Sequence, residues 1–194
     1  DIDGDEFYQL LRGSESIPST SQITYATFKE TFEKYINEGK KVLYLAGSSA
    51  ASGTYQSAMI ARNDVKGDVY IFDTYSLSIG GGILIEKAAH LANEGYEIDE
   101  IVKALEEHRD KSLVYFSVDS LDYLHKGGRI SGTKAAIGTL LNIKPILRIE
   151  DGLVKQKTQV RGSKKIIPTL IEQLKSEAGE DFSDRDVYVG YGDD

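Results

Sequence analysis

The segment VLYLAGSSAASGTYQ, residues 42–56, decides the fold of this chain, because it joins an apolar run to a stretch with helical spacing. Residues 42–46 have the length and composition of a buried strand, and residues 55–62 continue as a helix. A second apolar run follows at residues 69–72. Strand, helix and strand at this spacing predict a βαβ unit, so we expect an α/β protein with a parallel sheet and a right-handed crossover.

The turn between the first strand and its helix also predicts a binding site. Residues 48–56 contain three serines and a threonine, and a helix N-terminus directs unpaired backbone N–H groups and the positive end of the helix dipole toward one point. Ligands of parallel sheets gather at the carboxyl ends of the strands, where this turn and residues 73–78 both fall. The pattern favours a small anionic group, a phosphate or a carboxylate. The alternative is a plain helix cap, because Ser and Thr are ordinary N-cap residues.

Two further segments carry similar alternatives. The sequence PSTSQ at residues 18–22 precedes a helical pattern at residues 25–38, and is either a second hydroxyl-rich ligand loop or a polar loop with a plain cap. Three consecutive glycines, Gly80 to Gly82, open a long predicted helix that ends near residue 93. Glycine weakens a helix by about 1 kcal/mol relative to alanine, so we expect a neighbouring helix or a ligand to approach this backbone closely.

The rest of the chain predicts a second lobe. Asp151-Gly152 between two apolar runs is a strong hairpin signal, and a hairpin requires antiparallel pairing. We therefore expect a mixed or antiparallel sheet with helices, and divide the chain into an α/β lobe at residues 1–75 and a second α+β lobe at residues 76–194. The remaining predicted helices are residues 5–12, 98–109, 119–126, 133–142 and 166–177, and the remaining predicted strands are residues 113–118, 144–149, 153–159 and 186–191.

Composition restricts the function. A formal net charge of −8 over 194 residues disfavours a nucleic-acid partner, which draws on clustered Lys and Arg. The chain has no cysteine, and its three histidines lie far apart without metal-ligand spacing, so neither thiolate chemistry nor a metal site is expected. No nucleophile elbow or phosphate-binding P-loop sequence is present. No apolar run approaches the roughly 20 residues of a transmembrane helix, so we expect a soluble, cytoplasmic protein.

Several of these stretches together match one family. PSTSQ at residues 18–22, SSAASGTYQSA at residues 48–58, LHKGGRIS at residues 124–131, and IKPIL at residues 143–147 followed by Asp151-Gly152 resemble the DegV family of bacterial fatty-acid-binding proteins. The resemblance covers nearly the whole chain in order. Family members usually begin with a strand about 40 residues earlier and continue beyond residue 194, so the resemblance implies an incomplete family member.

The resemblance implies a two-lobed fold that binds a long-chain fatty acid, such as palmitate, stearate or oleate, without a covalent bond. The tail would be buried between the lobes and the carboxylate held by hydroxyls. By motif position, the carboxylate-binding set is Thr20, Ser21, Ser49, Ser52 and Gly53. Arg129 and Arg161 resemble the arginines that such proteins use near the head group or where a partner kinase docks.

On this basis the protein would be a lipid carrier and not an enzyme, with no catalytic residue, metal or cofactor of its own. It would present the fatty acid to a fatty-acid kinase, which forms an acyl phosphate for phospholipid synthesis. Two family positions differ here: Ile23 replaces the proline that usually follows T-S-Q, and Ala51 replaces the leucine that usually precedes S-G-T. The alternatives are an enzyme acting on a small phosphorylated substrate, and a purely regulatory binding module.

Overall fold

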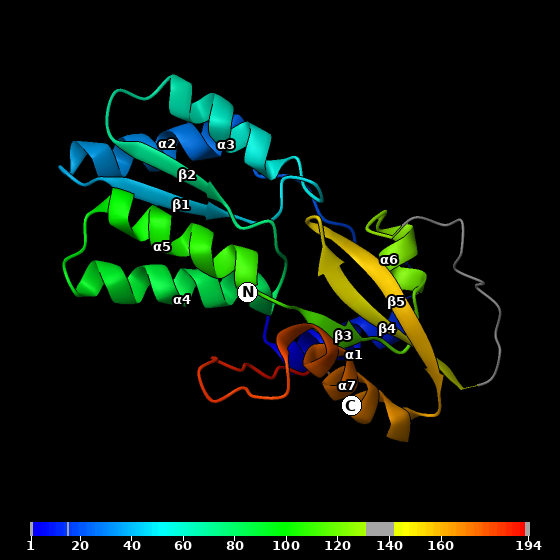
Figure 1. The fold of residues 1–194 in the computed structure, drawn as a ribbon. Coiled ribbons are helices and arrows are strands. Elements are labelled where there is room, and N and C mark those ends of the chain that lie inside the picture. Colours follow the sequence, from blue (N-terminus) through cyan, green and yellow to red (C-terminus); the bar gives the residue numbers. More distant parts are fainter. Residues whose placement is uncertain (1, 15, 131–141, 193–194) are drawn as a thin grey trace.

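A computed structural model describes residues 2–14, 16–130 and 142–192 of the chain (Figure 1). The predicted helix at residues 133–142 falls almost entirely outside these ranges. The described elements are α1 Gly4–Gly13, α2 Tyr25–Asn37, β1 Val42–Ala46, α3 Thr54–Asn63, β2 Val69–Asp73, α4 Ile79–Asn93, α5 Ile98–Lys111, β3 Tyr115–Ser117, α6 Asp122–Lys126, β4 Ile143–Glu150, β5 Leu153–Arg161, a short 3-10 helix Ser163–Lys165 and α7 Ile166–Ala178.

The βαβ unit predicted from the opening segment is confirmed. Strands β1 and β2 pair in parallel, with Val42 opposite Val69 and Ala46 opposite Asp73. Helices α2 and α3 cover one face of this sheet, and α4 and α5 cover the other (Figure 1). Because the two strands are parallel, both end at the same edge of the sheet, between the layer of α2 and α3 and the layer of α4 and α5.

Alternating side chains of the two strands supply both cores. Tyr44 and Ile71 pack with the buried rings of Phe28 and Phe32 under α2 and α3. Leu43 and Leu45 of β1 and Phe72 of β2 pack under α4 and α5. Successive strand residues point to opposite faces, so a five-residue apolar strand fills two cores at once.

Helices α4 and α5 belong to the β1–β2 sheet by their packing. Leu84 and Leu91 of α4 join Ile101 and Leu105 of α5 in one buried cluster with Phe72. We therefore propose that the lobes divide after α5, and not at residue 75. Below, the first lobe means α2 to α5 with β1 and β2, and the second lobe means β3 to β5 with α7.

The second lobe is an antiparallel sheet in the order β3-β4-β5, as the hairpin signal predicts. Asp151 and Gly152 form the two-residue turn, with φ angles of 53° and 72°. Two positive φ angles match the right-handed twist of the flanking strands, and Asp-Gly tolerates them well. A register shift between Ile146 and Leu147 of β4 accompanies their complete burial. Helix α7 packs against β3 and β4.

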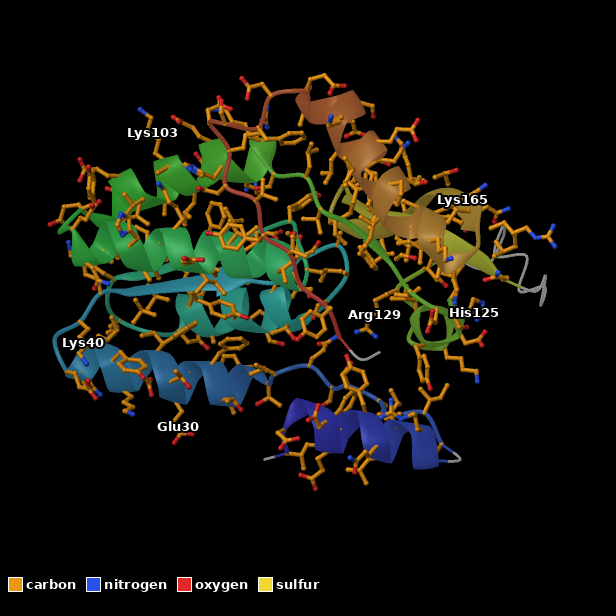
Figure 2. All side chains as sticks on the ribbon, turned by 90° about the horizontal axis from the view of Figure 1, so that it is seen from below. Glu30, Lys40, Lys103, His125, Arg129 and Lys165 are labelled. Atoms are coloured by element: carbon orange, nitrogen blue, oxygen red, sulfur yellow. The ribbon has the colours of Figure 1, made fainter. Side chains whose placement is uncertain are left out.

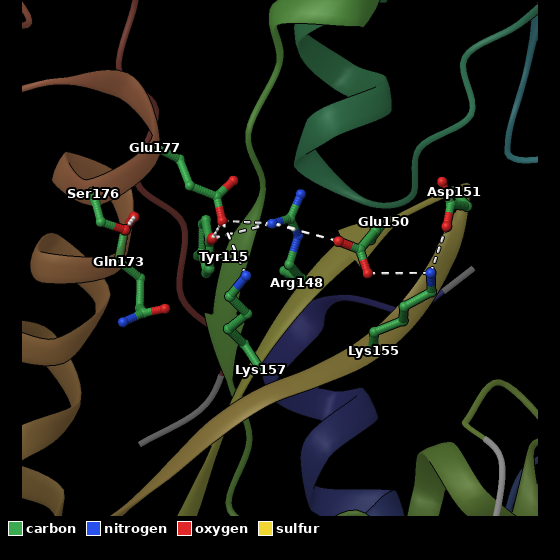
Figure 3. A network of polar contacts seen from close by, with 9 residues as sticks. All are labelled: Tyr115, Arg148, Glu150, Asp151, Lys155, Lys157, Gln173, Ser176 and Glu177. Carbon is green, nitrogen blue, oxygen red and sulfur yellow. Dashed lines mark hydrogen bonds and ion pairs between the residues drawn. The ribbon is translucent and has the colours of Figure 1, made fainter.

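A network of ion pairs joins α7 to this sheet (Figure 3). Glu177 of α7 accepts hydrogen bonds from Tyr115 and Arg148, the latter at 2.6 Å, and lies 3.3 Å from the Lys157 ammonium. The hydrogen bond from the Tyr115 hydroxyl holds the pKa of Glu177 below its ordinary value, and the nearby cations act in the same direction. Burial, together with the bond to Glu177, raises the pKa of Tyr115 to about 12.

One expectation about local structure is wrong. Residues 186–191, predicted as a strand, form no ladder with any described strand, and Val189 and Tyr191 are almost fully exposed. Apolar alternation identifies a segment that can pair, but does not supply a neighbour. The close approach expected at the glycine run occurs at Gly80, where it is made by the loop after β2 and the segment before β3 and not by a neighbouring helix: a Cβ on Gly80 would lie 2.2 Å from Ser76 Oγ and 2.6 Å from Val114 Cγ2. Among the described residues, no helix has the length and apolar character needed to cross a bilayer.

Candidate functional site

The turn after β1 is wound around Ser48. The Ser48 side chain is completely buried, and the Ser48 backbone N–H donates to the Ser76 carbonyl at 3.0 Å. Its carbonyl accepts from the N–H groups of Ala51 and Ser52, and its Oγ accepts from the Ala50 N–H at 3.2 Å. Ser48 is therefore a structural residue of the turn, and the residues after it are fixed by its two oxygens.

Asp73 connects this turn to the loop after β2. Its Oδ1 accepts from the N–H of Ser49 at 3.2 Å and from the N–H of Tyr75 at 2.9 Å. The expectation that several amides of the turn are unpaired is therefore wrong for residues 49–52, whose N–H groups all have acceptors. Sequence reasoning placed Asp73 at a ligand-binding edge without assigning it a role. The sequence signal that could have identified Asp73 is its position at the end of β2, the strand next to β1 in the parallel sheet.

The beginning of α3 retains the features of an anion site. Gly53 is the N-cap and offers no side-chain cap, and Ser52 Oγ accepts from the Thr54 N–H at 3.3 Å. A hydroxyl that accepts one bond still has a proton to donate, and the Ser52 proton has no acceptor among the described residues. The half-buried Ser52 therefore lies at the positive end of a ten-residue helix with one donor available.

The loop that carries Thr20 and Ser21 lies against this same turn. The contact is made by Gln22: a Cβ on Gly53 would lie 2.3 Å from its Nε2 atom. The two hydroxyl-rich motifs, separated by about 30 residues of sequence, thus meet in the fold. The Gln22 amide occupies the space that a side chain at position 53 would take, so a larger residue there would displace this amide.

The geometry of the Thr20 loop fits both interpretations, a ligand loop and an exposed polar loop before a capped helix. Thr24 is the N-cap of α2, and its Oγ1 accepts from the Thr27 N–H at 3.2 Å. Thr20 and Ser21 are exposed, and their hydroxyls bond to no other described residue. They are therefore free of the capping role. Their assignment as carboxylate ligands remains a prediction.

The two arginines of the predicted site lie in the second lobe. Arg129 follows α6 (Figure 2), is exposed, and donates from Nη1 to the Gly127 carbonyl at 2.5 Å. Arg161 is exposed at the end of β5, opposite Ile143. Neither guanidinium bonds to the residues of the 48–53 turn in the described part of the chain. Their proposed head-group role is untested by this geometry.

A cavity of about 430 Å³ lies between the lobes, next to the turn. Its walls come from the loop after β2, the end of α5 and the β4–β5 hairpin. Arg109 holds one wall in place, because its guanidinium stacks 5.3 Å from the Phe72 ring centroid and donates to the Asp73 carbonyl at 3.3 Å. Charged residues (Asp110, Arg148 and Glu150) and apolar residues (Leu84, Val114 and Ile149) both line it. Among the described residues, no group of acidic and histidine side chains is arranged to hold a metal ion.

The fold and this turn define a class: two-lobed α/β proteins in which a parallel βαβ layer carries a hydroxyl-lined turn beside an antiparallel second layer. A family comparison makes the assignment specific, because the model of the DegV family matches residues 1–194. The chain belongs to the DegV family.

Relatives and solved structures agree with this assignment. A DegV domain-containing protein of Clostridium perfringens is 45% identical over 175 residues, which cover 87% of this chain and 60% of that protein. A Thermus thermophilus structure described as fatty-acid binding of a DegV family protein has a TM-score of 0.82 at 34% identity, covering 93% of this chain and 64% of that one. A Thermotoga maritima structure described as revealing a fatty-acid-binding function has a TM-score of 0.79 at 37% identity, with coverages of 90% and 61%. The chain thus spans about three fifths of the length of these proteins.

Proposed function

We propose that this protein binds a long-chain fatty acid without a covalent bond, with the carboxylate held by the hydroxyls of Thr20 and Ser52. The observation that carries the proposal is the contact between Gln22 and Gly53, which brings the two hydroxyl-rich motifs together. Ser21, Ser49 and the Gly53 backbone complete the proposed set. The fatty-acid binding described for the Thermus thermophilus and Thermotoga maritima structures supports the same ligand class.

The energetics fit a hydroxyl site. Burial of an acyl chain contributes about 0.8 kcal/mol per methylene, so a palmitoyl tail offers on the order of 10 kcal/mol before the cost of association. The tail can therefore supply most of the affinity. The carboxylate needs only enough hydrogen bonds to offset its desolvation, and hydroxyl and amide donors at a helix N-terminus provide these without a buried cation.

We further propose that the protein is a carrier and not an enzyme, and that it presents the carboxylate to a fatty-acid kinase for acyl-phosphate formation and phospholipid synthesis. Thr20 and Ser21 are exposed, so a carboxylate held there stays within reach of a second protein. Arg129 and Arg161, also exposed, would face the head group or the kinase. The role places the protein in the cytoplasm, where a kinase has its nucleotide substrate.

Mass spectrometry of organic extracts tests the ligand. We expect the purified full-length protein to release a long-chain fatty acid, and consistent absence of any fatty acid would contradict the proposal. Thr20→Ala and Ser52→Ala should each reduce fatty-acid affinity by about tenfold or more, since each removes a hydrogen bond to a charged group worth about 1.5–3 kcal/mol. Thr31→Ala is the control, because Thr31 is an exposed hydroxyl on α2 that bonds only the Thr27 carbonyl.

A kinase assay tests the second role. Arg129→Ala should leave fatty-acid binding unchanged and reduce phosphorylation of the bound fatty acid. Arg185→Ala is a matched control, because Arg185 is exposed and its guanidinium likewise donates to a backbone carbonyl, that of Ala178. If Arg129→Ala abolished fatty-acid binding while the protein stayed folded, the assignment of Arg129 would be wrong.

A further inference from the structure

The tip of the β4–β5 hairpin reaches across the lobes and contacts the turn after β1. Gly152 is buried at this tip, and a Cβ placed on it would lie 2.2 Å from Ser48 Oγ and 3.2 Å from the Ala50 Cβ. The aromatic ring of Tyr75 would lie 3.3 Å from the same atom. The second lobe thus closes directly on the residue around which the turn is wound.

Glycine is required at this position for two separate reasons. The φ angle of Gly152 is 72°, which residues with a side chain rarely adopt. The space for a Cβ at this position is already filled by the first lobe. Gly39 satisfies the first condition without the second: its φ angle is 75°, and nothing lies within 4 Å of a Cβ placed there. The chain therefore contains its own control for backbone strain.

Ion pairs connect the hairpin tip to α7 (Figure 3). The ammonium of Lys155 on β5 lies 2.5 Å from Asp151 in the turn and 3.1 Å from Glu150 at the end of β4. Glu150 lies 3.6 Å from Arg148, which is bonded to Glu177 of α7. A continuous series of charged contacts thus runs from α7 to the turn residues next to Gly152.

We propose that Gly152 is a positioning residue for the carboxylate site, and that the hairpin tip fixes the conformation of residues 48–52 from outside the first lobe. Ser48 transmits the contact, because its carbonyl accepts from the Ser52 N–H at 3.0 Å and its Oγ from the Ala50 N–H. A displacement of Ser48 moves Ser52. This inference rests on the proposed function, in which Ser52 holds the carboxylate.

The test compares Gly152→Ala with Gly39→Ala in the full-length protein, using the affinity for oleate as the readout. Wild-type binding is established first, so a failure of the proposed function appears there and separately. We expect Gly152→Ala to weaken oleate binding by up to about tenfold, the loss expected for Ser52→Ala, because it displaces the same hydroxyl. Gly39→Ala should bind like the wild type. Equal affinities for the two folded variants would overturn the inference.

A double-mutant cycle separates positioning from general damage. In Gly152→Ala the new methyl group collides with Ser48 Oγ, so adding Ser48→Ala should recover part of the lost affinity relative to the sum of the single losses. Strictly additive losses would contradict the proposed contact, whatever their size.

Hydrogen exchange keeps the proposal testable if Gly152→Ala does not fold. On addition of oleate to the wild-type protein, we expect the amides of the hairpin tip and those of residues 48–52 to gain protection together. Protection of the turn with no change at the tip would overturn the inference.

Discussion

The two lobes of this protein are stabilised by different interactions. In the first lobe, both faces of a two-stranded sheet are covered by buried apolar side chains from four helices. Among the described residues of the second lobe, the fully buried apolar side chains are those of Ile146 and Leu147. Glu177, Arg148, Tyr115 and Lys157 form a shared polar network there. Burial responds little to protons and salt, whereas a charge network responds to both, so solution conditions should act mainly on the second lobe.

The largest effect is expected from a core deletion in the first lobe. Ile101→Ala removes a side chain that is 3% exposed and should lower the free energy of unfolding by about 2–5 kcal/mol, because it loses burial and leaves a cavity. Ile85→Ala, at an α4 position that is 52% exposed, should change it by less than about 0.5 kcal/mol. Urea unfolding measures both. Similar losses would contradict the account of this lobe as a packed core.

A smaller loss is expected from Glu177→Gln in the second lobe. The substitution keeps the shape but removes the charge that accepts from Tyr115, Arg148 and Lys157, and should cost about 1–2 kcal/mol because the side chains of Glu177 and Arg148 are only 25% and 15% exposed. Glu38→Gln is the matched control, since Glu38 lies at the same 2.6 Å from Lys40 on the surface. Its effect should be close to zero. A double-mutant cycle of Glu177→Gln with Arg148→Met would show whether the lost free energy of unfolding comes from the Glu177–Arg148 pair.

The same network should make stability depend on pH at both ends of the range. The pKa of Glu177 is lowered on folding, chiefly by the Tyr115 hydrogen bond, so its contribution is present above the ordinary value of 4.5 and is lost as the pH falls through the folded value. The pKa of Tyr115 is raised from 10.0 to about 12, so its contribution is complete below pH 10.0 and is lost as the pH rises toward about 12.

Partial exposure limits the alkaline effect to about 1 kcal/mol. We expect Tyr115→Phe to reduce the stability loss between these two pH values in urea unfolding, by the part that Tyr115 contributes. Absorbance titration should show one fewer late-ionising tyrosine. An unchanged alkaline profile in the variant would show that Tyr115 is not the responsible group.

The smallest effect is expected from an exposed ion pair of the first lobe. The Lys41 ammonium lies 2.8 Å from Glu97, and the two side chains are 53% and 72% exposed. Lys41→Met should lower the thermal midpoint only slightly, and the difference from wild type should disappear at high salt, because exposed charges are screened. A salt-independent loss would mean that the Lys41 stem, and not its charge, stabilises the β1 end of the sheet.

Local patterns in the sequence were sufficient to predict the main elements. The apolar runs at residues 42–46 and 69–72 gave the parallel pair, and Asp151-Gly152 gave the hairpin, because strand burial and positive φ angles depend on few neighbouring residues. The strand predicted at residues 186–191 failed because pairing depends on a partner that the segment itself does not specify.

The contacts that assemble the candidate site were beyond reach of the sequence. Gln22 meets Gly53, and Gly152 meets Ser48, across long separations in the chain. The Asp-Gly turn signal shows that glycine is favoured at position 152. It does not show that the first lobe occupies the space that a Cβ at this position would need. Asp73 and Ser48, which hold the turn through backbone hydrogen bonds, carry no distinctive residue pattern.

The contact of Gly152 with Ser48 also has a consequence for the order of folding. A hairpin with a two-residue turn closes within about 1–10 μs, whereas a parallel pair such as β1 and β2 must wait for its crossover helix. The tip can reach Ser48 only after both layers exist. We therefore expect the proposed carboxylate site to be completed in the final docking step, so that a nascent chain with a single finished layer would not yet bind the proposed fatty acid.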